Sequence, residues 1–174
     1  MPRISAKTLT ERLDGLEKAG VLCRKQLPTP ASVQVYELTA WGYLAEEPIK
    51  ALGAWAAASA GHDHTLPLSA ASLMVSFRTM FDAASARSHA LEGAIRIGEE
   101  DFRVVIKDGR LVAERGDLDM PDFIIRAPEA ALIAAGVYGK VAFGELAGAG
   151  VEVTGDAGSV QAFVDCFHLP PKVG

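Results

Sequence analysis

The first part of the chain alternates between apolar and polar positions at helical spacing. Ser5 precedes this segment and can cap a helix, because its side-chain oxygen accepts hydrogen bonds from amides two or three residues further on. Gly20 follows it and can end the helix in a left-handed conformation. One face of the predicted helix carries Ile4, Leu9, Leu13 and Leu16, at spacings close to one helical turn.

Two β-prone runs come next and predict a hairpin. Residues 21–27 and 33–38 are rich in strand-forming side chains, and the prolines between them remove backbone donors that a ladder needs. Thr39 can then cap a helix that runs to Ala56. Pro48 must bend this helix or mark its true first turn.

The periodicity lapses between Ser59 and Ser69, where the sequence is polar and contains a proline. Such a stretch is typical of a linker, which we place at residues 61–68. We therefore expect two domains, residues 1–60 and residues 69–174.

Beyond the linker, helical spacing gives way to alternation. A helix is predicted over residues 73–84, and strands over residues 91–97, 102–106 and 111–113. Asp108-Gly109 predicts a tight turn, because these residues tolerate positive φ. The pattern ends with a strand at 123–125, a helix opened by Pro128, a strand at 151–154 and a helix capped by Asp156. The expected fold class is α+β, with a small antiparallel-rich second domain.

Composition and charge restrict the function. The formal net charge of −5 argues against indiscriminate binding to nucleic acid or to an anionic membrane, although residues 1–26 are locally basic. No apolar run is long enough to span a membrane, and no leader segment is recognisable, so we expect a cytoplasmic protein with no membrane partner. The two cysteines, far apart in sequence, are expected to be reduced.

A short capped helix followed by a ribbon with a basic first strand has the layout of a recognition helix and a wing. The same pattern fits an ordinary αββ unit whose polar face is solvated. The sequence resembles the HxlR family, within the wider MarR-like winged helices. The resemblance rests on Ile4–Leu13, Leu16–Leu22, Arg24, Tyr36–Thr39, Gly42, Pro48, Leu52, Gly53 and Trp55.

This resemblance implies a partial winged helix-turn-helix that binds double-stranded DNA and forms a homodimer through the Leu44–Ala56 helix. The family's first helices would precede Met1, so we expect an upstream start or a shortened chain. The residues implied to read the DNA groove are Ser5, Lys7, Thr8 and Glu11. The implied phosphate contacts are Arg3 and Arg12 on the helix side and Arg24, Lys25 and Gln26 on the wing.

The second domain resembles sterol carrier proteins in reduced form. The resemblance rests on Glu92–Arg96, Phe102–Val104, Asp108–Leu111, Phe123–Ala130 and Val151–Asp156. It implies a sheet covered by helices around a cavity for a hydrophobic small molecule. The expected pocket residues are Phe77, Met80, Phe81, Phe143, Phe163 and Phe167, although each of them could equally fill the core.

The remaining chemical motifs predict no metal site, cofactor or catalytic residue. His62-Asp63-His64 lacks the further ligands of a closed metal site, and Cys166 near His168 is expected to be a buried thiol. The glycines between 144 and 158 match no phosphate loop. We therefore expect a dimeric DNA-binding regulator in which an apolar effector changes the spacing between the two DNA-binding units. The alternatives are a hydrophobic-metabolite carrier without DNA binding and, least favoured, an enzyme.

Overall fold

The computed structural model describes residues 4–28, 32–63 and 66–174. The chain divides into two compact units, residues 1–49 and residues 50–174. The division falls inside a helix, whereas the pattern of the sequence suggested a linker at 61–68. Among the described residues, no helix is long and apolar enough to cross a membrane.

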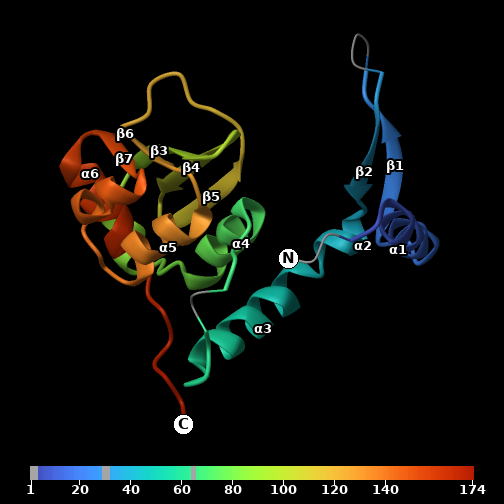
Figure 1. Ribbon diagram of the computed structural model, residues 1–174, viewed down its shortest axis with the longest axis horizontal. Helices are drawn as coiled ribbons and strands as arrows, with labels where there is room; N and C mark the ends of the chain where they lie inside the picture. Colours follow the sequence, from blue (N-terminus) through green and yellow to red (C-terminus); the bar gives the residue numbers. More distant parts are fainter. Residues whose placement is uncertain (1–3, 29–31, 64–65) are drawn as a thin grey trace. The chain divides into compact units, whose positions relative to one another are not determined.

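The first unit begins with a helix and a hairpin. Helix α1 (Ala6–Lys18) is capped by Ser5, whose hydroxyl accepts a hydrogen bond from the Thr8 amide at 3.1 Å, as predicted. Gly20 takes a φ of 77°, which ends the helix as expected. Strands β1 (Leu22–Gln26) and β2 (Gln34–Leu38) form an antiparallel hairpin in which Leu22 pairs with Leu38 (Figure 1).

The helix predicted after Thr39 is divided into two. Thr39 caps the short α2 (Ala40–Tyr43) by accepting from the Gly42 amide at 3.0 Å, and α3 (Glu46–Ala58) follows. Pro48 lies in the first turn of α3, where its missing amide costs no hydrogen bond. Gly42 is required because a Cβ there would lie 2.1 Å from the Val21 carbonyl oxygen.

The second unit contains a five-stranded sheet with the order β5-β4-β3-β6-β7. Its strands are β3 (Leu91–Ile97), β4 (Glu100–Lys107), β5 (Arg110–Arg115), β6 (Phe123–Ala127) and β7 (Glu152–Gly155). β3 and β6 are parallel, and the other neighbouring pairs are antiparallel. The turn at Asp108 and Gly109, with φ of 52° and 68°, is the predicted tight hairpin.

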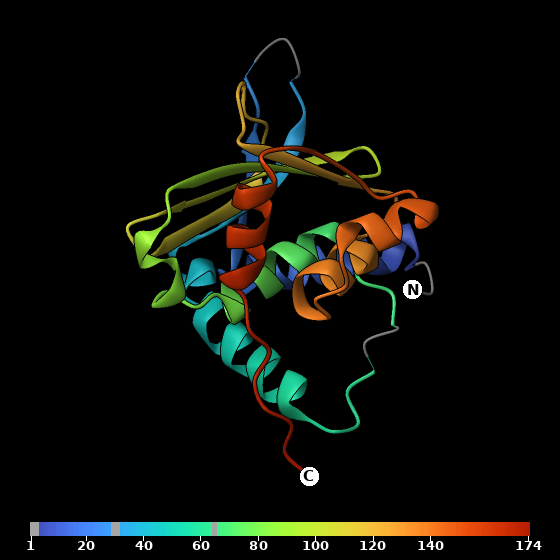
Figure 2. The same cartoon turned by 90° about the vertical axis from the view of Figure 1, so that its left-hand side faces the viewer.

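Helices α4 (Ala70–Met80), α5 (Ala130–Tyr138) and α6 (Ala157–Asp165) cover one face of this sheet (Figure 2). Two 3-10 helices, η1 (Ser85–Ser88) and η2 (Phe143–Ala149), complete the unit and were not expected from the sequence. Burial alternates along β4, where Phe102, Val104 and Ile106 point into the core. The expected α+β class with an antiparallel-rich sheet is confirmed.

Candidate nucleic-acid interface and ligand groove

The outer face of α1 is polar and open. None of the α1 residues, all of which the structure describes, is buried. Lys7 and Glu11 form an i,i+4 ion pair at 4.0 Å with side chains 86% and 64% exposed, so the pair is weak and both groups remain accessible. Thr8 and Arg12 are exposed on the same helix.

The hairpin is joined to α1 at its base. The Val21 amide donates to the Leu16 carbonyl at 3.0 Å, and the Thr39 hydroxyl donates to the Gly20 carbonyl at 2.7 Å. Leu22 is the one buried apolar side chain among the described residues of this unit. The helix and the hairpin therefore meet near one end of β1.

Two of the three predicted wing residues, Lys25 and Gln26, have partners within the hairpin. Lys25 forms an ion pair with Glu37 at 2.8 Å, which raises the pKa of Lys25. Gln26 donates to the Ser32 carbonyl at 2.8 Å and so closes the tip side of the hairpin. Both side chains lie on the exposed hairpin, where a phosphate could reach them.

Arg24 is held by neighbours on both sides. It forms ion pairs with Asp14 and with Glu17 of α1, the second at 3.4 Å. Its Nε donates to the Tyr36 hydroxyl at 3.4 Å, and its guanidinium carbon lies 5.6 Å from the centroid of that ring. The hydrogen bond to Tyr36 and the charge of Glu17 raise the pKa of Arg24.

The structure thus brings most of the predicted DNA-binding residues into one unit. Ser5, Lys7, Thr8, Glu11 and Arg12 belong to α1 and its cap, and Arg24, Lys25 and Gln26 to β1. Arg3 lies outside the described residues. The ion pairs of Arg24 with α1 could not be inferred from spacing alone.

Most of the predicted pocket residues lie in the core of the second unit. Phe77, Phe163 and Phe167 are fully buried, and their rings pack against one another with centroids 4.8 to 5.6 Å apart. Met80 is buried as well, and the Phe81 ring lies 5.9 Å from Phe167. Aromatic rings at these distances fill space rather than line a cavity.

Phe143 alone among the six lines a groove, which has a volume of about 360 Å³. The groove lies between the end of α5, the start of η2, β7 and α6. Its walls are Gly136, Lys140, Val141, Ala142, Phe143, Gly144, Val153, Ala157, Val160, Gln161 and Val164. Val160 and Val164 lie one helical turn apart on α6, and this spacing in the sequence could have located one wall.

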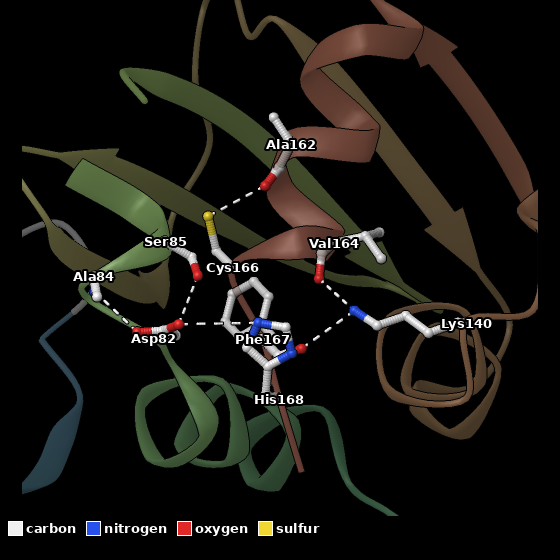
Figure 3. Close-up of polar contacts among 9 residues, drawn as sticks. All are labelled: Asp82, Ala84, Ser85, Lys140, Ala162, Val164, Cys166, Phe167 and His168. Atoms are coloured by element: carbon white, nitrogen blue, oxygen red, sulfur yellow. Dashed lines mark hydrogen bonds and ion pairs between the residues drawn. The ribbon is translucent and has the colours of Figure 1, made fainter. Parts of the chain in front are cut away.

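The two polar side chains of the groove are used within the protein. Lys140, at a φ of 53°, donates from Nζ to the Val164 carbonyl at 2.7 Å and to the Phe167 carbonyl at 3.2 Å (Figure 3). Its positive charge is thereby placed at the C-terminal end of α6, where it interacts favourably with the helix dipole. Gln161 donates to Asp165 at 2.9 Å. An apolar molecule is therefore the chemistry that suits this groove.

Cys166 is a buried thiol, as predicted. Its Sγ donates to the Ala162 carbonyl at 3.1 Å, and burial raises the pKa of Cys166 to about 11 (Figure 3). The imidazole of His168 lies 3.9 Å from Asp82, which also accepts from the Ser85 hydroxyl at 2.6 Å. A protonated thiol without a neighbouring base is a poor nucleophile.

Within the described ranges, no group of three or more histidine, cysteine or acidic side chains is placed to hold a metal ion. Of the His62-Asp63-His64 motif, His64 lies outside those ranges. At the groove, the side chains of Lys140 and Gln161 bond to backbone carbonyls and to Asp165.

Solved structures similar to this chain include two sulfatases and a ubiquinone synthesis protein. One is a double mutant of the sec-alkyl sulfatase PisA1, with 19% identity, a TM-score of 0.51 and coverage of 62% of this chain and 18% of that chain. Another is the stereoselective inverting sec-alkylsulfatase Pisa1 from Pseudomonas sp., with 17% identity, a TM-score of 0.47 and coverage of 55% and 16%. This chain spans less than a fifth of these sulfatases, so the likeness concerns the fold alone.

A third structure is a UbiJ-SCP2 ubiquinone synthesis protein, with 15% identity, a TM-score of 0.41 and coverage of 71% of this chain and 93% of that chain. No curated protein sequence matches the chain. The family model described as HxlR-like helix-turn-helix matches residues 1–64, which include α1, the hairpin and α3. The N-terminal part of this chain is thus HxlR-like, as the resemblance of its sequence predicted.

Proposed function

We propose that this protein is a DNA-binding transcription regulator of HxlR type. The observation that carries the proposal is that α1 buries none of its residues, all of them described, and exposes Lys7, Thr8, Glu11 and Arg12 beside a two-stranded hairpin. A helix of 13 residues is about 20 Å long and fits the major groove of B-DNA, which is about 12 Å wide. We place this role in the cytoplasm.

The charges of the first unit support this assignment. Lys7 and Arg12 can approach phosphates or base edges, while Lys25 offers a second cation on the hairpin. The ion pairs of Lys7 and Lys25 are exposed, so phosphates can compete for these side chains at little cost. We assign Ser5, Lys7, Thr8 and Glu11 to the bases and Arg3, Arg12, Lys25 and Gln26 to the phosphates.

The test is a titration of the full chain with duplex DNA selected by the protein from a random pool, at several salt concentrations. We expect the protein to prefer the selected sequence, and we expect the logarithm of the binding constant to fall linearly with the logarithm of the salt concentration. Arg12→Met should lower the magnitude of the salt slope by about 1, as the loss of one phosphate contact requires. Lys107→Met, on the β4–β5 hairpin, is the control and should leave the slope unchanged. Affinity without salt or sequence dependence would refute the proposal.

A second candidate function, binding of an apolar small molecule, is favoured by the groove that Phe143, Val153, Val160 and Val164 line. Its polar groups are already paired, so a ligand without buried charge fits best. In a regulator this ligand would be the effector. In the alternative, the protein would carry the ligand and would not bind DNA.

A pair of glycine substitutions tests the groove. A Cβ at Gly136 would lie 2.2 Å from the Phe143 ring, so Gly136→Ala must push that ring out of place. A Cβ at Gly148, which lies in η2 and does not line the groove, would meet no atom within 4 Å, so Gly148→Ala is the matched control. With dodecanol as the probe, we expect ligand-dependent thermal stabilisation in the wild type and the control, and a weaker effect in Gly136→Ala. Equal stabilisation of all three would exclude this groove as the binding site.

A further inference from the structure

We infer that Arg24 is a positioning residue that sets the angle between α1 and the hairpin, rather than a phosphate contact of the wing. The inference rests on the proposed DNA-binding function. It gives Arg24 a role other than the phosphate contact that the sequence resemblance implied, and it adds Asp14, Glu17 and Tyr36 to the residues proposed to support DNA recognition.

The contacts of Arg24 join two elements. On one side lie Asp14 and Glu17 of α1, both ion-paired with the Arg24 guanidinium. On the other side lies Tyr36 of β2, which pairs with Arg24 across the hairpin and accepts a hydrogen bond from its Nε. One side chain thus connects the helix with both strands.

The charge of this cluster disfavours a phosphate. One guanidinium and two carboxylates sum to a net charge of −1, so an approaching phosphate meets repulsion rather than attraction. A phosphate could bind Arg24 only by displacing the carboxylates. Lys25 and Arg12 carry no such excess of negative charge, because Lys25 has a single acidic partner and Arg12 forms no ion pair within the described part of the chain.

The position of Arg24 provides a second contact point between α1 and the hairpin. The other links between α1 and the hairpin gather near Leu22, where Val21 bonds to Leu16 and Thr39 bonds to Gly20. Arg24 lies two residues further along β1, about 7 Å from Leu22. Contacts at two separated points fix an angle, whereas contacts at one point leave a hinge.

Fixing this angle matters for sequence specificity. Base contacts need both α1 and the hairpin in one orientation, whereas non-specific binding tolerates many orientations because phosphates lie along the whole duplex. Loss of Arg24 should therefore lower specific affinity more than non-specific affinity.

The experiment compares Arg24→Met with Lys18→Met in the full chain. Each variant removes one positive charge, but Lys18 forms no ion pair within the described residues and is not part of the cluster. For each protein, affinity for selected and for scrambled duplexes is measured over a range of salt. We expect Arg24→Met to lower the ratio of specific to non-specific affinity by about fivefold, with an unchanged salt slope on selected DNA. Lys18→Met should lower both affinities together.

A second set of variants leaves Arg24 in place and removes its partners on α1. Asp14→Asn with Glu17→Gln should reproduce the loss of specificity, and adding Arg24→Met to this pair should cause no further loss. If Arg24 contacts a phosphate instead, freeing it from the carboxylates should increase specific affinity, and Arg24→Met should lower the slope by about 1. Either result would overturn the inference.

A thermal unfolding cycle of the same variants without DNA separates this inference from the proposed function. Coupling between Arg24 and the two carboxylates is expected whether or not DNA binds. If the wild-type protein does not bind DNA, both the proposed regulator function and the role of Arg24 in DNA recognition are refuted. DNA binding without coupling in the cycle would refute the positioning role alone.

Discussion

At the scale of single residues, partners decide what a side chain can do. Arg24 and Lys25 are neighbours on one strand, yet Arg24 has two carboxylates of α1 beside it and Lys25 has one exposed partner on β2. Phe143 and Phe163 are both aromatic and both belong to the second unit. Phe143 lines a groove, whereas Phe163 is fully enclosed by other rings.

The two cysteines provide a prediction at this scale. Cys23 is exposed on β1 and Cys166 is buried with a pKa of about 11. Because a raised pKa keeps the thiol protonated at neutral pH, only Cys23 should react with a disulfide reagent such as Ellman's reagent. The expected stoichiometry in the native wild type is one thiol, which doubles in denaturant. A native Cys23→Ser variant that still reacts at once would contradict the burial of Cys166.

At the scale of elements, caps define where helices begin. Ser5, Thr39, Ser69 and Asp156 each accept a hydrogen bond from a backbone amide three residues on, at the starts of α1, α2, α4 and α6. All but Ser69 were predicted as caps, because capping depends on residues adjacent in sequence. The split between α2 and α3 at residues 44 and 45 agrees with the expectation that Pro48 marks the true first turn of the second helix.

The cap of α6 predicts a dependence of stability on pH. Hydrogen bonds from the amide and the hydroxyl of Ser159 lower the pKa of Asp156. A lowered pKa means that the stabilisation is present above the unfolded pKa of about 3.9 and is lost as the pH falls through the folded value. Asp156→Asn keeps a capping oxygen without the charge, so its urea midpoint should fall less between pH 7 and pH 3 than that of the wild type. Parallel pH curves for the two proteins would contradict this account.

Helix α3 predicts self-association. Ile49, Leu52 and Trp55 lie on one of its sides and are exposed, at 53%, 62% and 76%. Apolar side chains gathered on one helix face favour a partner helix, and the family resemblance implies a second copy of this chain. Leu52→Glu should shift the protein from dimer to monomer in analytical ultracentrifugation. Met120→Glu, at a side chain that is 89% exposed in a loop, is the control and should leave the assembly unchanged.

At the scale of the whole molecule, the two units differ in their cores. The second unit buries a continuous set of apolar residues from α4, α5, α6 and the sheet. The first unit relies on Leu22, the backbone bonds at the hairpin base and exposed ion pairs. Because buried apolar surface provides most of the stability of a fold, the second unit should be the more stable.

Hydrogen exchange measured by mass spectrometry can check this difference. Amides of α1, β1 and β2 should exchange through small local openings, whereas those of β3, β4 and β6 should exchange only at the rate of global unfolding. Saturating selected DNA should slow exchange in the first unit and leave the second unit little changed. Equal protection of both units in the free protein would show that the first unit has a stabilising contact beyond Leu22 and the surface pairs.

The sequence by itself determined the local features of this protein. Periodicity located α1, α4 and α6, capping residues marked the starts of α1 and α6, and Asp108-Gly109 specified the β4–β5 turn, because these signals depend on residues within a few positions of one another. Only the tertiary structure decided which strands pair in parallel, which phenylalanines fill the core, and that Arg24 faces Asp14 and Glu17. These features join residues far apart in the chain, and the packing of the whole unit selects among many partners that the sequence pattern alone would allow.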